Sequence, residues 1–241
     1  MVFGLIHYRC WGAIVRGTFP SLEHYEILRN LRFDLVIDVG ANKGQFSLMV
    51  HLFRKNVAIE AFEPLFLEAS KYSRLFRGVD EVVLHNVAVG ETVGSAVFHV
   101  SASRDSSSLL PIGELQTEFF PETRESSLCK VSLITLDSLS SRWKKTRQAL
   151  LKIDVQGAEL EVLRGAKETL KHCAFVYVEC SHVTLYDGQH LFPEVAELLD
   201  ESGFAQTRVA NEYWNDERLI QADYLFERKD CRGGDNLHGI G

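Results

Sequence analysis

Short apolar runs alternate with stretches of helical periodicity along most of the chain. The apolar runs are short and bounded by turn residues, and they predict buried strands at residues 34–39, 57–62, 81–87, 150–154 and 174–179. The stretches between them place apolar residues on one helical face and predict helices at 44–54, 65–76, 159–170 and 194–200. This alternation predicts an α/β fold with a mostly parallel sheet, right-handed crossovers and helices on both faces.

Some segments depart from this alternation. Residues 96–100 follow a turn between Gly90 and Gly94 and predict an antiparallel excursion, and residues 224–227 predict a last strand. Residues 101–130 are rich in Ser, Glu and Thr. A loop of that length is usually functional or disordered.

The length of 241 residues suits one sizeable α/β domain and is short for two. We predict an N-terminal helical segment over residues 1–30, one domain over 31–228 and a flexible, glycine-containing tail over 229–241. Residues 5–15 predict a short amphipathic or packing helix, with a membrane-surface segment as the alternative. No apolar run reaches the roughly 20 residues that span a bilayer, so we expect no transmembrane segment.

Composition narrows the classes of partner. A formal net charge of -7 argues against a general nucleic-acid binder, which needs clustered Lys and Arg. The basic residues at 142–147 favour a solvated helix end over a binding patch. The five cysteines are scattered and form no C-x-x-C pair, so we expect neither a disulfide framework nor a zinc finger, and a reducing, cytoplasmic setting.

The strongest motif follows the first predicted strand and opens a helix. Glycine in this turn lets a ligand approach the backbone, and the helix N-terminus favours an anionic group. A dinucleotide G-x-G-x-x-G fingerprint would place Asn42 and Gln45 at its second and third glycines, a poor match. The pattern acidic-x-G-x-N/G-x-G matches at every position, with Asp38, Gly40, Asn42 and Gly44.

Polar residues also follow the other predicted strands, where ligands of such sheets bind. Glu63 ends the second strand, and a carboxylate there accepts both hydroxyls of a ribose; the alternative is a helix N-terminal charge beside Pro64. Asn86 follows the third strand and is placed to contact an adenine edge, with Ala88 as an apolar wall, although Asn is also common before turns. Asp154 ends the fourth strand and faces the predicted pocket, with a mere turn as the alternative.

Several of these stretches together resemble the FkbM family of methyltransferases, and the similarity runs from about residue 30 to 228. They are Val36-Ile-Asp-Val-Gly-Ala-Asn-Lys-Gly44, Ala61-Phe-Glu-Pro64, Asn86-Val-Ala-Val-Gly90, Leu151-Lys-Ile-Asp-Val-Gln-Gly-Ala-Glu159 and Gly203-Phe204. The resemblance implies a class I methyltransferase fold, a Rossmann-like, doubly wound, mostly parallel seven-stranded sheet with an antiparallel C-terminal strand. It also implies S-adenosyl-L-methionine as cofactor and O-methylation of a sugar, glycolipid or natural-product hydroxyl. One departure is Gln156, where the family usually reads Lys-Ile-Asp-x-Glu-Gly.

Methyl transfer from a sulfonium is an in-line displacement, so positioning supplies much of its rate. An alcohol is a poor nucleophile and benefits from a general base or a metal. We place Asp154 near the transferred methyl and expect Glu179 or His182 to take the proton, with an ordinary loop histidine as the alternative for His182. A metal shared by Asp154 and Glu179 is disfavoured because no further ligands at suitable spacing accompany them, so we predict no metal.

Two other functional classes stay open. One is a different Rossmann enzyme that uses NAD or another nucleotide, which the loop spacing disfavours, and the other is a non-catalytic cofactor-binding protein. Residues 101–108 either fold over the acceptor or form a solvated loop. We expect a small-molecule, glycan or glycolipid acceptor and no nucleic acid, and the sequence leaves the acceptor and the oligomeric state open.

Overall fold

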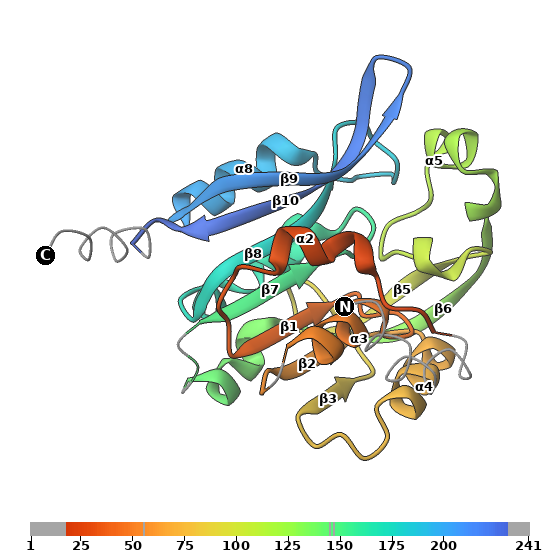
Figure 1. Cartoon of the computed structure of the whole chain (residues 1–241). Coiled ribbons are helices and arrows are strands. Elements are labelled where there is room, and N and C mark those ends of the chain that lie inside the picture. Colours follow the sequence, from red (N-terminus) through yellow and green to blue (C-terminus); the bar gives the residue numbers. More distant parts are fainter. Residues whose placement is uncertain (1–17, 55, 145, 147, 231–241) are drawn as a thin grey trace, which may run out of the picture.

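The computed structural model describes residues 18–230 except 55, 145 and 147 (Figure 1). The predicted helix at 5–15 and most of the predicted tail therefore lie outside the described residues. Of the predicted N-terminal helical segment, the described part contains the 3-10 helix η1 (Leu22–His24) and the short helix α2 (Tyr25–Leu28). No helix in the described part of the chain is long and apolar enough to cross a bilayer.

Seven strands form the main sheet in the order β3-β2-β1-β7-β8-β10-β9. Their bounds are β1 (Leu35–Val39), β2 (Ala58–Phe62), β3 (Val82–His85), β7 (Ala149–Ile153), β8 (Cys173–Ser181), β9 (Phe204–Asn215) and β10 (Arg218–Arg228). Strand β10 is antiparallel to both of its neighbours, whereas the five strands from β3 to β8 pair in parallel. The predicted fold class, with its antiparallel C-terminal strand, is confirmed.

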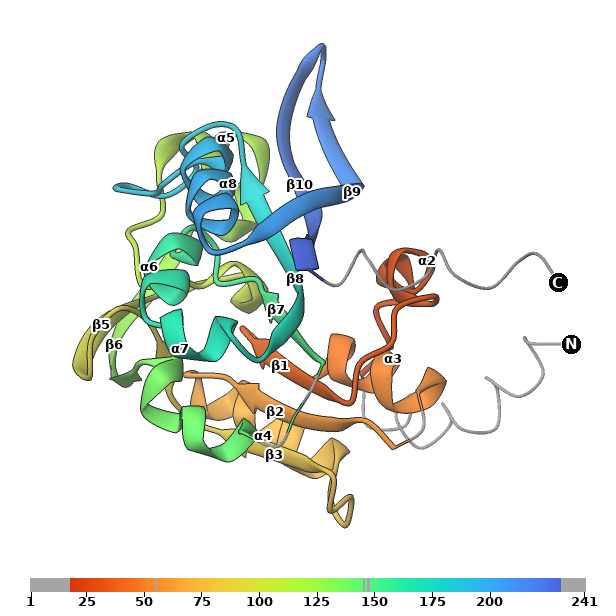
Figure 2. The same ribbon diagram turned by 90° about the vertical axis from the view of Figure 1, so that its left-hand side faces the viewer.

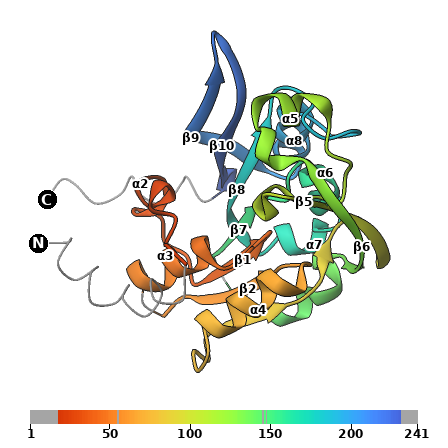
Figure 3. The same cartoon turned by 90° about the vertical axis from the view of Figure 1, so that its right-hand side faces the viewer.

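Helices cover both faces of this sheet, as Figures 2 and 3 show for α3 and for α6 and α7 on opposite sides. The helices are α3 (Gln45–Phe53), α4 (Phe66–Leu75), α6 (Glu159–Arg164), α7 (Lys167–Leu170) and α8 (Phe192–Glu201), with the 3-10 helix η4 (Leu136–Trp143). The predicted helix at 159–170 is split at Gly165, where an added Cβ would lie 2.1 Å from the carbonyl oxygen of Gly90. The two backbones are thus packed in direct contact.

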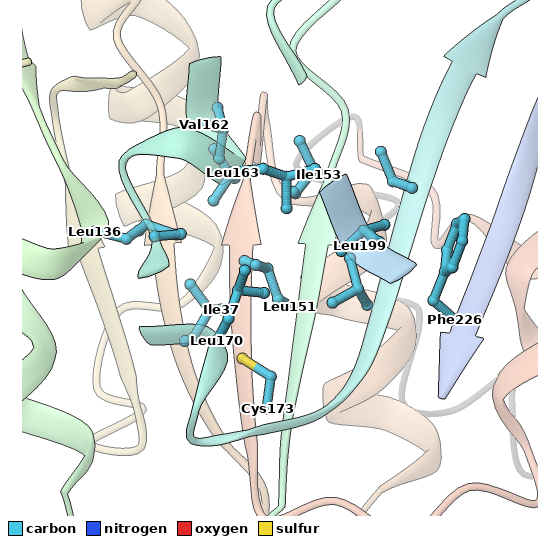
Figure 4. Close-up of a cluster of buried hydrophobic side chains, with 14 of the residues drawn as sticks. Ile37, Leu136, Leu151, Ile153, Val162, Leu163, Leu170, Cys173, Leu199 and Phe226 are labelled. Carbon is cyan, nitrogen blue, oxygen red and sulfur yellow. The ribbon is translucent and has the colours of Figure 1, made fainter. Parts of the chain in front are cut away.

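The strand side chains alternate between two hydrophobic clusters. Ile37 and Leu151 point to the cluster under η4, α6, α7 and α8, which Figure 4 shows in close-up. Val36 and Leu150 point to the other cluster, under α2, α3 and α4. Because the central strands are buried on both faces, they appear in the sequence as continuous apolar runs.

A second, three-stranded sheet holds β4 (Ala88–Val89), β5 (Gly94–Ser101) and β6 (Glu125–Ile134) in the order β4-β6-β5. The predicted strand at 81–87 is β3, which ends at His85, and β4 follows it in the second sheet. The predicted antiparallel excursion is β5, which pairs with β6. Residues 101–130 are not one long loop: they contain η2 (Arg104–Ser106), α5 (Glu114–Phe119), η3 (Pro121–Thr123) and the first part of β6. Within β6 only Val131 is buried, so the strand has no apolar pattern to reveal it.

Candidate active site

The carboxyl ends of β1, β2, β7 and β8 surround a cavity of about 330 Å³. Its wall includes the loop after β1, the turns after β2 and β7, and the segment from Ser21 to His24, together with residues of the second sheet, of the segment 104–109 and of β8, β9 and β10. The strand order reverses between the neighbouring strands β1 and β7: the chain runs from β1 outward to β2 and β3 on one side, and from β7 outward to β8 on the other. A doubly wound sheet binds its ligands at this point, and the cavity lies there.

The glycine loop predicted from the sequence forms one wall of this cavity. Gly40 has a φ of +78°, and an added Cβ would lie 1.7 Å from the carbonyl oxygen of Asp154. The loops after β1 and β7 therefore touch through their backbones at this point. Gly40 and Asn42 line the cavity, while Gly44, at the start of α3, packs against Tyr72 behind the loop.

Asp38 lies beneath the loop and outside the cavity wall, and it is fully buried. Its Oδ2 accepts a hydrogen bond from Ser47 Oγ at 2.6 Å, and its Oδ1 lies 3.3 Å from Nζ of Lys152. That ammonium also donates to the carbonyl oxygen of Gly40 at 3.0 Å and lies 3.5 Å from Oδ2 of Asp154. Burial alone would lower the pKa of Lys152, but the charges of Asp38 and Asp154 outweigh it and raise the pKa.

Lys152 was not among the predicted site residues, although it stands in the motif around Asp154. Its signal in the sequence is a single charge inside a buried apolar strand, between Leu151 and Ile153. Such a charge is rare unless it is paired. In the structure, Lys152 joins the glycine loop, the buried Asp38 and the cavity-facing Asp154 into one unit.

Glu63 lines the cavity at the end of β2 and is held by two backbone donors. Its Oε2 accepts from the N–H of Asn42 at 2.9 Å, and its Oε1 accepts from the N–H of Leu65 at 2.8 Å. Burial raises the pKa of Glu63 to about 7, against the opposing effect of these two donors. Each carboxylate oxygen keeps a second lone pair for a ligand.

Asn86 and Ala88, which were both predicted to contact the adenine after the third strand, have different positions in the structure. The Asn86 Nδ2 donates to the carbonyl oxygens of Glu63 at 2.8 Å and of Pro64 at 3.0 Å, and Asn86 is not part of the cavity wall. Its amide thus stabilises the turn that carries Glu63. Ala88 does line the cavity, in an apolar part of the wall together with Leu65, Phe98 and Leu109.

Asp154 and Glu179 face the cavity from β7 and β8, and the side chain of Gln156 links them. The Gln156 Nε2 donates to Asp154 Oδ1 at 2.7 Å and to Glu179 Oε2 at 2.9 Å. Its Oε1 accepts from the hydroxyl of Tyr186 at 2.9 Å, and Glu179 Oε1 accepts from Gln221 Nε2 at 3.2 Å. Burial, followed by the charge of Asp154, raises the pKa of Glu179 well above its usual value.

The departure at Gln156 thus places a neutral amide donor between two acidic side chains. A glutamate in the same place would add a third carboxylate and remove both donated hydrogen bonds. In the described residues, no three His, Cys, Asp or Glu side chains form a group that could hold a metal ion.

His182 lies outside the cavity wall. Its Nε2 lies 2.5 Å from the hydroxyl of Tyr224, and its ring packs 5.2 Å from that of Phe192 at the start of α8. Burial lowers the pKa of His182. Side chains alternate along β8, so residue 182 points to the face opposite Glu179.

We expect His182→Gln to leave cofactor affinity and turnover within about twofold of the unsubstituted protein, because His182 does not reach the cavity. The lost partner of Tyr224 should lower the free energy of unfolding by about 1 kcal/mol. Calorimetry with S-adenosylhomocysteine and urea denaturation measure the two effects. A large loss of turnover with unchanged stability would place His182 in the chemistry after all.

A second polar cluster on the cavity wall was not predicted, and it joins His24, Tyr177, Asn211 and Asp223. The hydroxyl of Tyr177 donates to Asp223 Oδ2 at 2.8 Å, and Asn211 Nδ2 donates to the same oxygen at 2.6 Å. The Nδ1 of His24 lies 2.9 Å from the Tyr177 hydroxyl and 3.3 Å from Asp223 Oδ2. Burial would raise the pKa of Asp223, but the contacts with His24, Asn211 and Tyr177 lower it.

The segment at 101–108 contributes Arg104, Asp105 and Ser107 to the cavity wall. The Arg104 guanidinium lies 3.5 Å from Oε2 of the buried Glu68 in α4. The Ser107 hydroxyl accepts from the N–H of Ser101 at 3.0 Å. This segment is therefore folded against the cavity and is not a solvated loop.

The family model and the curated relative that match the chain are both methyltransferases. A family model described as "Methyltransferase FkbM domain" matches residues 38–205. The 2-O-methyltransferase NoeI of Sinorhizobium fredii (strain NBRC 101917 / NGR234) is 28% identical over 171 residues, covering 68% of this chain and 70% of that protein.

Solved structures with low sequence identity also resemble the chain. A fibrillarin/Nop5p complex aligns with a TM-score of 0.48 and 16% identity, over 86% of this chain and 81% of that chain. Magnesium protoporphyrin IX methyltransferase of Synechocystis PCC 6803, with bound SAM, aligns with a TM-score of 0.45 and 10% identity, over 92% and 79% of the two chains.

Proposed function

The chain belongs to the FkbM methyltransferase family and is an S-adenosylmethionine-dependent methyltransferase, and from this premise we propose that it methylates a hydroxyl group of a sugar or a sugar-bearing acceptor. The observation that carries the proposal is the cavity in which the glycine loop and Glu63 stand beside the linked carboxyl groups of Asp154 and Glu179. The 2-O-methyltransferase NoeI, a distant relative, supports a hydroxyl as the acceptor.

The residues around the glycine loop fit the nucleoside half of the cofactor. Gly40 lets the loop after β1 approach the backbone of Asp154 closely, and Glu63 has lone pairs for the two ribose hydroxyls. The apolar wall that includes Ala88 and Leu65 suits the adenine ring. Asp38 and Gly44 act from outside the wall, by holding Lys152 and by starting α3.

Asp154 and Glu179 fit the position of methyl transfer. The cofactor supplies a sulfonium-bound methyl group, and a nearby carboxylate stabilises the positive charge of that sulfonium. The amide of Gln156 fixes both carboxyl groups in one geometry, so that Asp154 faces the cofactor and Glu179 accepts a hydrogen bond from the acceptor hydroxyl. These two residues therefore position the reactants.

The test of the cofactor site is calorimetric binding of S-adenosylmethionine to the Glu63→Gln variant. We expect affinity to fall about 10- to 100-fold, the range for losing charge-assisted hydrogen bonds. The matched control is Glu81→Gln, an exposed glutamate at the edge of β3, which should bind like the unsubstituted protein. Unchanged affinity in Glu63→Gln would remove the ribose role from Glu63.

The same residue gives the binding a pH dependence. The pKa of about 7 means that Glu63 loses its charge as the pH falls through neutrality. Because the ionised carboxylate is the stronger acceptor, affinity for the cofactor should be about tenfold weaker at pH 6 than at pH 8. Glu63→Gln should abolish this slope between pH 6 and pH 8. A flat profile in the unsubstituted protein would contradict the prediction.

The acceptor is tested by measuring release of S-adenosylhomocysteine with a panel of sugars and methyl glycosides. Transfer to a sugar hydroxyl should be lost when that hydroxyl is replaced by hydrogen, because the nucleophilic oxygen is then absent. Transfer to a non-sugar hydroxyl or to nitrogen, with none of the sugars active, would contradict the sugar proposal and leave the methyltransferase family unaffected.

A further inference from the structure

The polar cluster of His24, Tyr177, Asn211 and Asp223 has no role in the site described so far. All four residues line the cavity, and they come from η1, β8, β9 and β10. We infer that His24 is the general base that takes the proton of the acceptor hydroxyl, with Asp223 and Tyr177 as positioning residues that hold its ring. This inference rests on the proposed O-methylation.

The contacts of the cluster favour one of the two ring nitrogens of His24 as the one that carries hydrogen. The hydroxyl of Tyr177 gives its one hydrogen to Asp223, so toward His24 its oxygen can only accept. Two acceptor oxygens face Nδ1 of His24, that of Tyr177 at 2.9 Å and Oδ2 of Asp223 at 3.3 Å, and they favour a hydrogen on Nδ1 over the one opposing donor, Nδ2 of Asn211 at 3.2 Å. In a neutral imidazole this leaves the lone pair on Nε2, which is the form that accepts a proton.

The Nε2 of His24 is also left open to a substrate. It lies 3.7 Å from Oε1 of Glu23, beyond hydrogen-bond distance, and the Glu23 side chain is more than half exposed. The rings of Phe46 and Tyr177 meet the imidazole edge-on with centroid distances of 5.5 Å, which restricts its rotation. Within the described part of the chain, the ring is therefore held through Nδ1 and has no hydrogen-bond partner at Nε2.

The segment that carries His24 is tied to the rest of the site. The N–H of Ser21 donates to the carbonyl oxygen of Gln45 in α3 at 3.2 Å. The guanidinium of Arg208 in β9 donates to the carbonyl oxygen of Ile27 at 2.9 Å. Figure 1 shows α2 between α3 and the β9–β10 hairpin, as these contacts require. His24 thus reaches the cavity from a fixed backbone.

Glu179 is the competing base, and its contacts suit another task. Both of its oxygens already accept amide hydrogens, from Gln156 and from Gln221. These donors favour the ionised carboxylate, but burial and the charge of Asp154 outweigh them and raise the pKa of Glu179, so its ionised form is disfavoured in the free site. Among the described residues, His24 Nε2 has no such donor within hydrogen-bond distance, so Glu179 orients the hydroxyl and His24 removes the proton.

The proposed step balances without another reactant. A lone pair of the hydroxyl oxygen forms the bond to the methyl carbon while the carbon–sulfur bond breaks and its electrons stay on sulfur. The hydroxyl proton passes to Nε2 of His24. The positive charge of the sulfonium thus reappears on the imidazolium, beside the carboxylate of Asp223. The imidazolium then gives its proton to solvent.

The tautomer can be measured without knowing the acceptor. Nitrogen-15 NMR of the full chain labelled at histidine, with the His24 signal assigned by its loss in His24→Gln, should show hydrogen on Nδ1 and an unprotonated Nε2. Asp223→Asn should shift His24 toward the Nε2–H form, because Nδ1 loses its carboxylate partner. An Nε2–H tautomer in the unsubstituted protein would overturn the inference.

Turnover on the sugar acceptor found in the panel gives the second test. His24→Gln should lower kcat by about 100-fold or more, the range for general-base catalysis, with cofactor affinity within about twofold. Added imidazole should restore part of the activity of His24→Ala, which a purely structural role would not allow. The control is His51→Gln, an exposed histidine in α3.

The outcomes separate the two proposals. Full kcat in His24→Gln overturns the role of His24 and leaves O-methylation intact. If no sugar in the panel is methylated, the sugar proposal fails, and the NMR tautomer alone decides whether His24 is held as a base.

Discussion

Replacing Lys152 by methionine is expected to lower the free energy of unfolding by about 3–5 kcal/mol, the range for breaking a buried ion pair from one side. The substitution keeps the length of the side chain but leaves the fully buried Asp38 without its cation and the carbonyl oxygen of Gly40 without its donor. Urea denaturation followed by circular dichroism measures this loss. Cofactor affinity should fall as well, since Lys152 holds the glycine loop against Asp154.

Two further variants show whether the loss of stability arises from the unpaired carboxylate of Asp38. Adding Asp38→Asn to Lys152→Met should recover part of the stability, because the uncompensated carboxylate is then gone. Lys171→Met removes an exposed lysine that lies 2.7 Å from Glu168 and should change the free energy of unfolding by about 0.5 kcal/mol or less. Equal losses in Lys152→Met and Lys171→Met would contradict the prediction.

Gly40→Ala is expected to weaken binding of S-adenosylmethionine by about 100-fold or more, the scale that a displacement of about 1 Å in a site can reach. The new Cβ would lie 1.7 Å from the carbonyl oxygen of Asp154, so the loops after β1 and β7 must move apart. That movement displaces both the cofactor loop and the carboxylate of Asp154. Calorimetry on the folded variant measures the binding.

Gly78 provides a matched control for the backbone conformation. Its φ of +79° is nearly that of Gly40, but an added Cβ would meet no atom within 4 Å. Gly78→Ala should therefore lower the free energy of unfolding by about 1–2 kcal/mol through the left-handed conformation alone, with unchanged cofactor affinity. If both variants bind the cofactor equally well, the close approach at Gly40 is not what the loop requires.

The parts of the site that the sequence predicted are those set by local spacing. Gly40, Asn42 and Glu63 follow two neighbouring parallel strands, and each strand ends at a position that its apolar run makes visible. Asn86 was found by the same logic, but its amide binds the turn around Glu63. The position of Asn86 after a strand therefore predicted that it lies near the cavity. The sequence did not predict that its side chain turns toward the carbonyl oxygens of Glu63 and Pro64.

The histidine at the cavity could not be found this way. His182 was favoured because it follows Glu179 closely, yet its position along the strand sends it to the other face. His24 lies 153 residues from Tyr177 in the sequence, and only the folded sheet brings the two together. Asp223 did carry a signal, as one acidic residue between buried apolar neighbours in β10.

The fold was predictable where strands are buried and unpredictable where they are exposed. The central strands β1 and β7 are buried at every position. In β9, by contrast, only Phe204 is buried, so its twelve residues resemble a polar loop. The same holds for β6, which pairs with β5 through its backbone and buries few side chains.

The two halves of the cavity wall are built from different parts of the chain. The half around Glu63 comes from the central strands and the three-stranded sheet, while the half around His24 comes from the first described residues and the β9–β10 hairpin. In the described part of the chain, the hairpin joins the other strands of the main sheet through the pairing of β10 with β8. Substitutions along its outer strand can therefore leave the register of β1, β2 and β7 unchanged. The molecule is in this sense modular, because side chains on the outer strand can change while the strands that carry Gly40 and Glu63 keep their pairing.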